Sequence, residues 1–245
     1  MKENSLPKEL IGEAIGTFII VFIGCGTVAL EILFDSFGHI VPIATLWGIA
    51  VAIAIYSSRG ISPAHLNPAV TVAMFLNKDV PLFKIPLYWI AQFIGAFLAA
   101  VFLFVIFKNT LFDFEEVQSV NTAKMFGEYY SVSTPSAFLF EMFGTMFLVF
   151  MIFVIVTKVR NNNLIPILIG SVVTIAIIIV APHTQCGINP ARDLAPRILS
   201  HLFGWDEVAF SQEAILVYVL APIFGGILGF LSFKGLITLF KKRAQ

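Results

Sequence analysis

Two polar segments that each carry proline interrupt an otherwise very apolar sequence, and they constrain the fold more than any other feature. The first spans residues 62–70 (SPAHLNPAV) and the second spans residues 187–193 (GINPARD). Asparagine is a favoured helix N-cap and proline is favoured at the first helical position, so each Asn-Pro-Ala predicts a loop that turns into a short helix. Two such interruptions in corresponding positions of two halves indicate a binding or conduction site near the middle of a membrane.

The composition excludes a soluble fold. Of the 245 residues, 58% are hydrophobic and 12% are charged, against about 45–50% and about 25% in soluble domains. The mean hydropathy is +0.93 and phenylalanine occurs 26 times, which is more apolar surface than a soluble protein can hide. We therefore expect a multi-span protein in a lipid bilayer. The 15 basic residues balance the 15 acidic ones, so no basic field favours nucleic acid as a partner.

Six apolar stretches are long enough to cross a membrane as helices, which takes about 20 residues each. They cover about 8–33, 40–57, 84–107, 135–157, 164–181 and 212–240. Two shorter helices, about 67–76 and 189–199, are too short to cross and are expected to re-enter the membrane from one side. The one long polar stretch, about 109–134, is expected to connect two halves.

The halves repeat, and the repeat predicts their relative orientation. The segment EAIGT at 13–17 is matched by EMFGT at 141–145, and the first Asn-Pro-Ala by the second. Each half has three full spans, so the second must enter the membrane from the opposite side, as an inverted repeat. We predict an all-α membrane protein with six transmembrane helices plus two re-entrant half-helices. Residues 1–245 would form a single transmembrane channel domain, with halves about 8–108 and 135–240 joined by an extracellular loop of about 109–134.

The placement of the basic residues predicts the orientation in the membrane. With the N-terminus inside, eleven of the 15 lysines and arginines fall on the cytoplasmic side. This distribution obeys the positive-inside rule and predicts a cell-membrane protein with both termini in the cytoplasm. The remaining four basic residues are Lys108, Lys124, Arg192 and Arg197.

The point where the two re-entrant segments meet determines which kind of solute could pass. Irregular backbone at membrane depth persists only where it is buried in protein or lines a wet cavity. Loop carbonyls would accept hydrogen bonds along such a cavity, the two asparagine amides would donate, and the half-helix N-termini would add positive partial charge. An uncharged polar solute fits this arrangement, whereas a cation or a hopping proton meets a barrier. The two motifs comprise Asn67, Pro68, Ala69, Asn189, Pro190 and Ala191.

The paired motifs, the Glu-x-x-Gly-Thr segments and the repeat order resemble the major intrinsic protein family of aquaporins and glycerol facilitators, over nearly the whole chain. Asp193 after the second motif, Trp47, residues 64–67 (AHLN) and Gly204-Trp205 resemble its aquaglyceroporin branch. The resemblance implies an aquaporin-like fold and a passive channel for glycerol, similar small uncharged solutes and water. It also implies a homotetramer with one pore in each subunit, no enzyme activity, no cofactor and no metal.

Arg192 is the residue we expect at the outer constriction, because an arginine in a membrane segment is expensive and usually faces a pathway. The alternative is an arginine that snorkels to the membrane interface. By resemblance Trp47 is the filter aromatic, the alternatives being a lipid-interface anchor or a core residue. Ile177 stands where the glycerol-facilitator pattern has glycine, and Cys186 where it has phenylalanine. The filter is therefore mixed, which leaves the relative permeability to water and glycerol open.

The buried acids allow two interpretations. Glu13 and Glu141 could relay protons, but no second carboxylate or histidine lies near either in sequence; the resemblance implies that each braces a re-entrant loop. Asp193 is expected to hold the loop or a neighbouring chain. His65 either lines the pore or is a buried structural histidine. The remaining loop residues expected to line the pore are Ala64, Leu66, Gly187 and Ile188.

Three functional classes remain to be weighed. A passive facilitator is favoured; its candidate solutes are glycerol, water, dihydroxyacetone, urea, hydrogen peroxide and undissociated lactic acid. An ion- or proton-coupled secondary transporter also uses inverted repeats and broken helices, but it would need a titrating carboxylate at the substrate. A membrane enzyme has no supporting phosphate loop, nucleophile–base pair or metal spacing. Cys25 is expected to be a small core residue, and no disulfide with Cys186 is expected.

Overall fold

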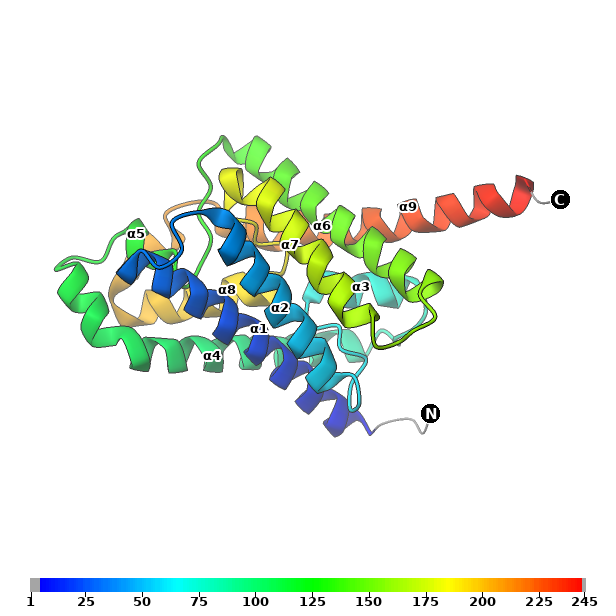
Figure 1. Cartoon of the computed structure of the whole chain (residues 1–245), viewed down its shortest axis with the longest axis horizontal. Helices are drawn as coiled ribbons and strands as arrows, with labels where there is room; N and C mark the ends of the chain where they lie inside the picture. The colour runs from blue at the N-terminus through cyan, green and yellow to red at the C-terminus, as the bar shows by residue number, and fades with distance from the viewer. Residues whose placement is uncertain (1–4, 244–245) are drawn as a thin grey trace.

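The computed structural model describes residues 5–243, with side chains to residue 239, and the described part is built from helices. Figure 1 shows the long helices side by side in one bundle, with the end of the last helix projecting beyond it. In chain order the elements are α1 (Leu6–Phe34), α2 (Ile40–Ser58), α3 (Pro68–Leu76), α4 (Lys84–Phe114), α5 (Val120–Ala123), α6 (Thr134–Lys158), α7 (Ile165–Thr184), α8 (Pro190–Ser200), η1 (His201–Trp205), η2 (Asp206–Phe210), η3 (Leu216–Leu220) and α9 (Ala221–Arg243).

Six of these helices are long and apolar enough to cross a membrane, which confirms the predicted spans. Two boundaries differ from the sequence prediction. Helix α4 continues to Phe114, so the first part of the stretch expected to be a loop at 109–134 is helical. Packing stabilises these extra turns, because Leu111 is buried in a cluster with Met125, Phe126 and Trp205. Hydropathy alone does not reveal this cluster. The last span begins with the π-helical turn η3 at Leu216 and continues into α9.

The packing of the helices follows the inverted repeat. Helix α1 packs on α4 and α2, as α6 packs on α9 and α7, and α2 meets α7 at the centre. Each half-helix lies against the last long helix of the other half: α8 on α4, and α3 on α9 (Figure 1). The two halves are therefore interlocked, and the fold is the six-helix, two-half-helix arrangement predicted above.

Glycines allow the central helices to approach closely. A Cβ atom on Gly48 of α2 would lie 2.5 Å from the carbonyl oxygen of Gly170 in α7, and one on Gly170 would overlap the carbonyl of Gly48. Small residues at such crossings let the backbones pack directly against each other. In a membrane the hydrophobic effect does not drive helices together, so this close packing holds them. The close α2–α7 contact fixes where the two halves meet.

Large apolar side chains remain exposed on the outside of the bundle, among them Phe102, Val105 and Ile179. This surface suits lipid tails. Lys2, which was used to predict orientation, lies outside the described residues, and so do the side chains of Lys241, Lys242 and Arg243.

Candidate functional site

The two asparagines cap the half-helices as predicted. Asn67 accepts a hydrogen bond from the backbone N–H of Ala69 at 2.9 Å, and Asn189 accepts from the N–H of Ala191 at 3.1 Å. A proline follows each asparagine at the first helical position, where its missing N–H leaves no bond unmade. Both half-helices therefore begin at the Asn-Pro-Ala turns.

The two turns also bind each other, although they lie more than a hundred residues apart. The side-chain amide of Asn67 donates to the carbonyl of Ile188 at 2.9 Å, and that of Asn189 donates to the carbonyl of Leu66 at 2.9 Å. Each amide nitrogen carries two hydrogens, so one remains on each side to donate to a molecule between the half-helices. The reciprocal pair fixes the two helix N-termini at one point.

The loops that lead into these turns have an unusual backbone. Ala64 and Leu66 before the first turn have φ of 56° and 53°, and Cys186 and Ile188 before the second have φ of 69° and 40°. Residues other than glycine rarely adopt this left-handed region, and when they do the surrounding structure must hold them there. Gln185, directly before Cys186, also has a positive φ of 61°. Neither loop can form a regular helix or strand through these positions.

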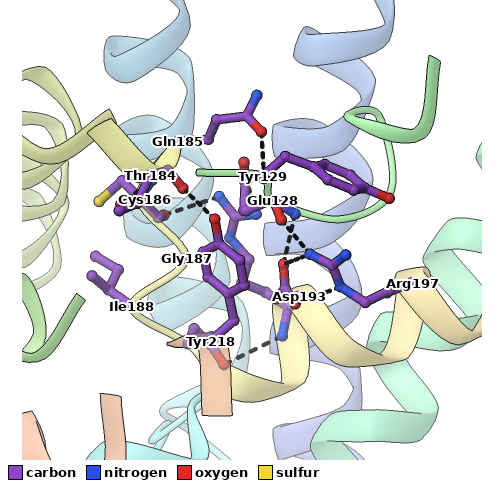
Figure 2. A network of polar contacts seen from close by, with 12 residues as sticks. Glu128, Tyr129, Thr184, Gln185, Cys186, Gly187, Ile188, Asp193, Arg197 and Tyr218 are labelled. Carbon is purple, nitrogen blue, oxygen red and sulfur yellow. Dashed lines mark hydrogen bonds and ion pairs between the residues drawn. The ribbon is translucent and has the colours of Figure 1, made fainter. Parts of the chain in front are cut away.

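Two buried carboxylates hold the strained loops. Glu13 accepts from the N–H groups of His65 and Leu66 at 2.9 and 2.7 Å. Glu141 accepts from those of Gly187 and Ile188 at 2.8 and 2.7 Å (the second loop is drawn in Figure 2). A third donor reaches each carboxylate: Gln92 donates to Glu13 and Thr184 donates to Glu141. This geometry fits bracing, and neither of these two carboxylates borders the cavity, as a proton relay to the solute would require.

One cavity of about 520 Å³ runs between the two halves past both turns. At one mouth it is bounded by Arg59 and Asn162, and at its other end by Arg192. Most of the wall is apolar and comes from α1, α2, α6 and α7. The predicted pore-lining loop residues all border the cavity, and so do the four predicted filter residues: Ala64, His65, Leu66, Gly187, Ile188, Trp47, Ile177, Cys186 and Arg192.

The end of the cavity at Arg192 is a tight cluster. The guanidinium carbon lies 4.3 Å from the ring centroid of Trp47, and the guanidinium donates to the carbonyl of Cys186 at 3.2 Å. Trp47 packs against Gly24, where any Cβ would overlap the indole ring. Arg192 is only 4% exposed, so the buried contacts do not fit a snorkelling arginine.

Sequence reasoning missed one member of this cluster. Glu128 was assigned only to the polar connection between the halves, but it is buried and forms an ion pair with Arg192. The signal that could have shown this is aromatic: Phe126 and Tyr129, which flank Glu128, are buried. A loop with large apolar side chains on both sides of an acid folds inward.

Asp193 acts on the same connection. Its carboxylate accepts from the N–H of Glu128 at 2.7 Å and from Arg197 at 3.0 and 3.1 Å. It therefore holds the segment that carries Glu128 and not the Asn-Pro-Ala loop itself. Cys25 and Cys186 are both buried free thiols. Within the described residues no group of three or more His, Cys, Asp or Glu side chains could hold a metal ion.

Comparison with known proteins finds a matching family and several relatives for this chain. Residues 1–233 match the family model described as major intrinsic protein. The chain is 36% identical to the glycerol uptake facilitator protein of Escherichia coli K12 over 240 residues, which cover 92% of this chain and 85% of the relative. It is also 36% identical to human aquaporin-9 over 241 residues, which cover 93% and 81%.

A solved structure agrees with these sequence matches. The X-ray structure of the aquaglyceroporin from Plasmodium falciparum superposes with a TM-score of 0.85 at 26% identity, over 95% of this chain and 97% of that one.

Proposed function

The chain belongs to the major intrinsic protein family, and we infer from this membership and from the cavity that it is a passive channel for glycerol and water. The observation that carries the proposal is the reciprocal bond between Asn67 and Asn189 and the opposite loops, inside one cavity lined by both halves. The relatives are a glycerol uptake facilitator and an aquaporin, so the chain is a channel and not an enzyme.

The cavity suits solutes with hydroxyl groups along one side. In this proposal the hydroxyls accept from the free N–H groups of Asn67 and Asn189 and donate to loop carbonyls, while the carbon side slides along the apolar wall. At the outer end Trp47 offers an apolar face and Arg192 offers N–H donors on the adjacent side. Conduction needs binding that is favourable at several points but tight at none, which a row of single hydrogen bonds supplies.

Exclusion of cations rests on the half-helix N-termini. Each helix end carries roughly half a positive charge, and the cross-link brings both ends to the same point. The side-chain oxygens of both asparagines already accept from helix N–H groups, so toward the cavity their amides only donate, and the proton relay along a chain of waters is interrupted there. We propose that Glu13, Glu141 and Asp193 act as braces in this channel and that Trp47, Ile177, Cys186 and Arg192 form its filter.

A coupled secondary transporter fits the structure less well. Coupling would require a carboxylate that exchanges protons or binds an ion beside the substrate. Glu13 and Glu141, the buried acids that brace the two loops, are each engaged by three donors, and the buried Glu128 is paired with Arg192. None of these three side chains borders the cavity.

Cys186 gives a direct test of the proposed route. It is almost fully buried in the protein but borders the cavity beside Arg192, and a thiol is a soft ligand for soft metals. Mercuric chloride is expected to block both glycerol and water flux in proteoliposomes of the wild type, because a mercury atom would fill the constriction. Cys25 does not border the cavity, so Cys186→Ser is expected to conduct both solutes and resist the block.

Protein-free liposomes set the baseline for this assay. Equal inhibition of wild type and Cys186→Ser would remove Cys186 from the filter, and wild-type flux no higher than the baseline would remove the channel function. The same assay ranks the other proposed solutes: dihydroxyacetone, urea, hydrogen peroxide and undissociated lactic acid. The small Cys186 and bulky Ile177 make this ranking specific to the chain.

We further propose a homotetramer in the cell membrane with both termini in the cytoplasm, one channel domain per chain, and the connection between the halves outside. The excess of basic residues on one side supports the orientation, and the exposed apolar surface supports contact with lipid and with other subunits. Single cysteines are introduced into the connection between the halves, and their labelling in intact cells by a reagent that does not cross the membrane tests the orientation. The mass of the detergent-solubilised protein tests the tetramer.

A further inference from the structure

Arg192, the positively charged residue of the proposed filter, forms an ion pair with Glu128 inside the protein. The side chains of Arg192 and Glu128 are 5% and 6% exposed and form an ion pair. The other contacts of the guanidinium are the carbonyl of Cys186 and the ring of Trp47. The sequence predicts no partner for Arg192, whereas in the structure the carboxylate of Glu128 lies against it.

The backbone of Glu128 is fixed from both sides. Its N–H donates to Asp193 at 2.7 Å and its carbonyl accepts from Arg197. Asp193 and Arg197 are themselves a fully buried ion pair on α8. Figure 2 shows both side chains pointing toward the segment that carries Glu128.

The next residues of the segment are held in the same way. The N–H of Tyr129 donates to Gln185 at 2.6 Å, that of Tyr130 to Gln212 at 2.9 Å and that of Ser131 to the carbonyl of His183 at 2.9 Å. Four successive backbone N–H groups therefore have fixed partners. The carboxylate of Glu128 is placed against Arg192 by the fold and does not reach it by chance from a free loop.

We propose that Glu128 is a specificity-determining residue of this channel: its carboxylate holds Arg192 against the wall and makes the outer constriction a neutral pair instead of a lone cation. The inference rests on the proposed function. A paired guanidinium donates less strongly to a passing hydroxyl, so solutes leave the constriction faster. It also presents no net charge, so the half-helix ends and not Arg192 carry most of the rejection of cations.

The pair responds to pH. Burial raises the pKa of Glu128 to about 7, and the neighbouring Arg192 opposes that rise. Because the raised value favours the protonated acid, acidification through neutral pH removes the negative charge and leaves Arg192 uncompensated. Asp193 and Arg197 form a separate ion pair beside Glu128, and thiols and phenols are neutral in this range. The groups within electrostatic reach of Glu128 are Arg192, Asp193, Arg197, Cys25, Cys186, Tyr129 and Tyr218.

Glu128→Gln tests the proposal, with Glu116→Gln as a matched control because Glu116 is an exposed acid of the same connection. We measure glycerol permeability and small-anion and potassium leak in proteoliposomes at external pH 8 and pH 5.5. At pH 8, Glu128→Gln is expected to lower glycerol permeability about fivefold, because a guanidinium whose charge is no longer offset by a carboxylate makes stronger charge-assisted hydrogen bonds to the hydroxyls of glycerol and releases them more slowly. It is also expected to raise anion leak while potassium leak stays low.

The pH dependence completes the test. Wild type and Glu116→Gln are expected to move toward the Glu128→Gln values as the external pH falls to 5.5, and Glu128→Gln is expected to stay constant. The proposal is overturned if Glu128→Gln keeps wild-type permeability and pH profile, or if it leaks anions and potassium alike, which would show a merely structural role. Failure of wild type to conduct glycerol at pH 8 would instead refute the proposed function.

Discussion

Proteoliposomes that contain Arg192→Ala are expected to leak potassium and protons at least about tenfold faster than those with the wild type, which corresponds to about 1.4 kcal/mol of lost barrier. The substitution removes the guanidinium and leaves the buried carboxylate of Glu128 without its partner at the constriction. A lone negative charge in a narrow, water-poor passage attracts cations strongly. Glycerol flux should persist because the asparagine cross-link and both loops are untouched.

Arg192→Lys is the matched control for charge. It keeps a cation opposite Glu128 but loses the planar contact with Trp47 and the bond to Cys186. The leak of Arg192→Lys is therefore expected to stay near that of the wild type. A wild-type leak in purified, conducting Arg192→Ala would contradict the account of charge at the constriction.

Glu141→Gln is expected to destroy most of the glycerol and water flux and to lower the thermal stability of the purified protein. The glutamine amide keeps one acceptor oxygen but places an NH2 group where the other oxygen stood, against the donor from Ile188 or against those from Gly187 and Thr184. Each buried donor left without an acceptor costs about 1–3 kcal/mol. Because Ile188 is held in a strained conformation, the second loop is expected to relax into the cavity and close it.

Thermal melting in detergent and flux per reconstituted protein measure the two effects separately. Glu207→Gln is the control, since Glu207 is an exposed acid outside the cavity. Wild-type stability and flux in Glu141→Gln would show that the loops hold their shape without the carboxylates. The bracing role would then be wrong.

The sequence predicted the parts of the site that depend on local chemistry. The starts of the half-helices follow from the capping preferences of Asn67 and Asn189 and from the prolines after them. The six spans follow from the hydropathy, and the inverted repeat follows from an odd number of spans in each half. Helix caps are determined within a few residues, and each span is one continuous apolar segment, so both can be predicted without knowing the contacts between distant segments.

Sequence reasoning failed where the fold joins distant segments. No spacing rule connects Glu128 to Arg192, because the contact depends on Asp193 and Arg197 fixing the backbone of a long connection. The extension of α4 to Phe114 likewise depends on Leu111 packing against Trp205, nearly a hundred residues later. The closeness of Trp47 and Arg192 was expected from the family resemblance and not from any spacing rule. The reciprocal bonds of the asparagines cannot be read from a single sequence.

The claim of passive conduction is tested most directly by asking whether the protein can concentrate glycerol. Proteoliposomes loaded with equal glycerol inside and outside are given an inward proton gradient or an inward sodium gradient, and internal glycerol is followed over time. The account predicts no net movement under either gradient, and rapid equilibration as soon as a glycerol gradient is imposed. Accumulation of glycerol above the external concentration, driven by either ion, would contradict it and favour a coupled transporter.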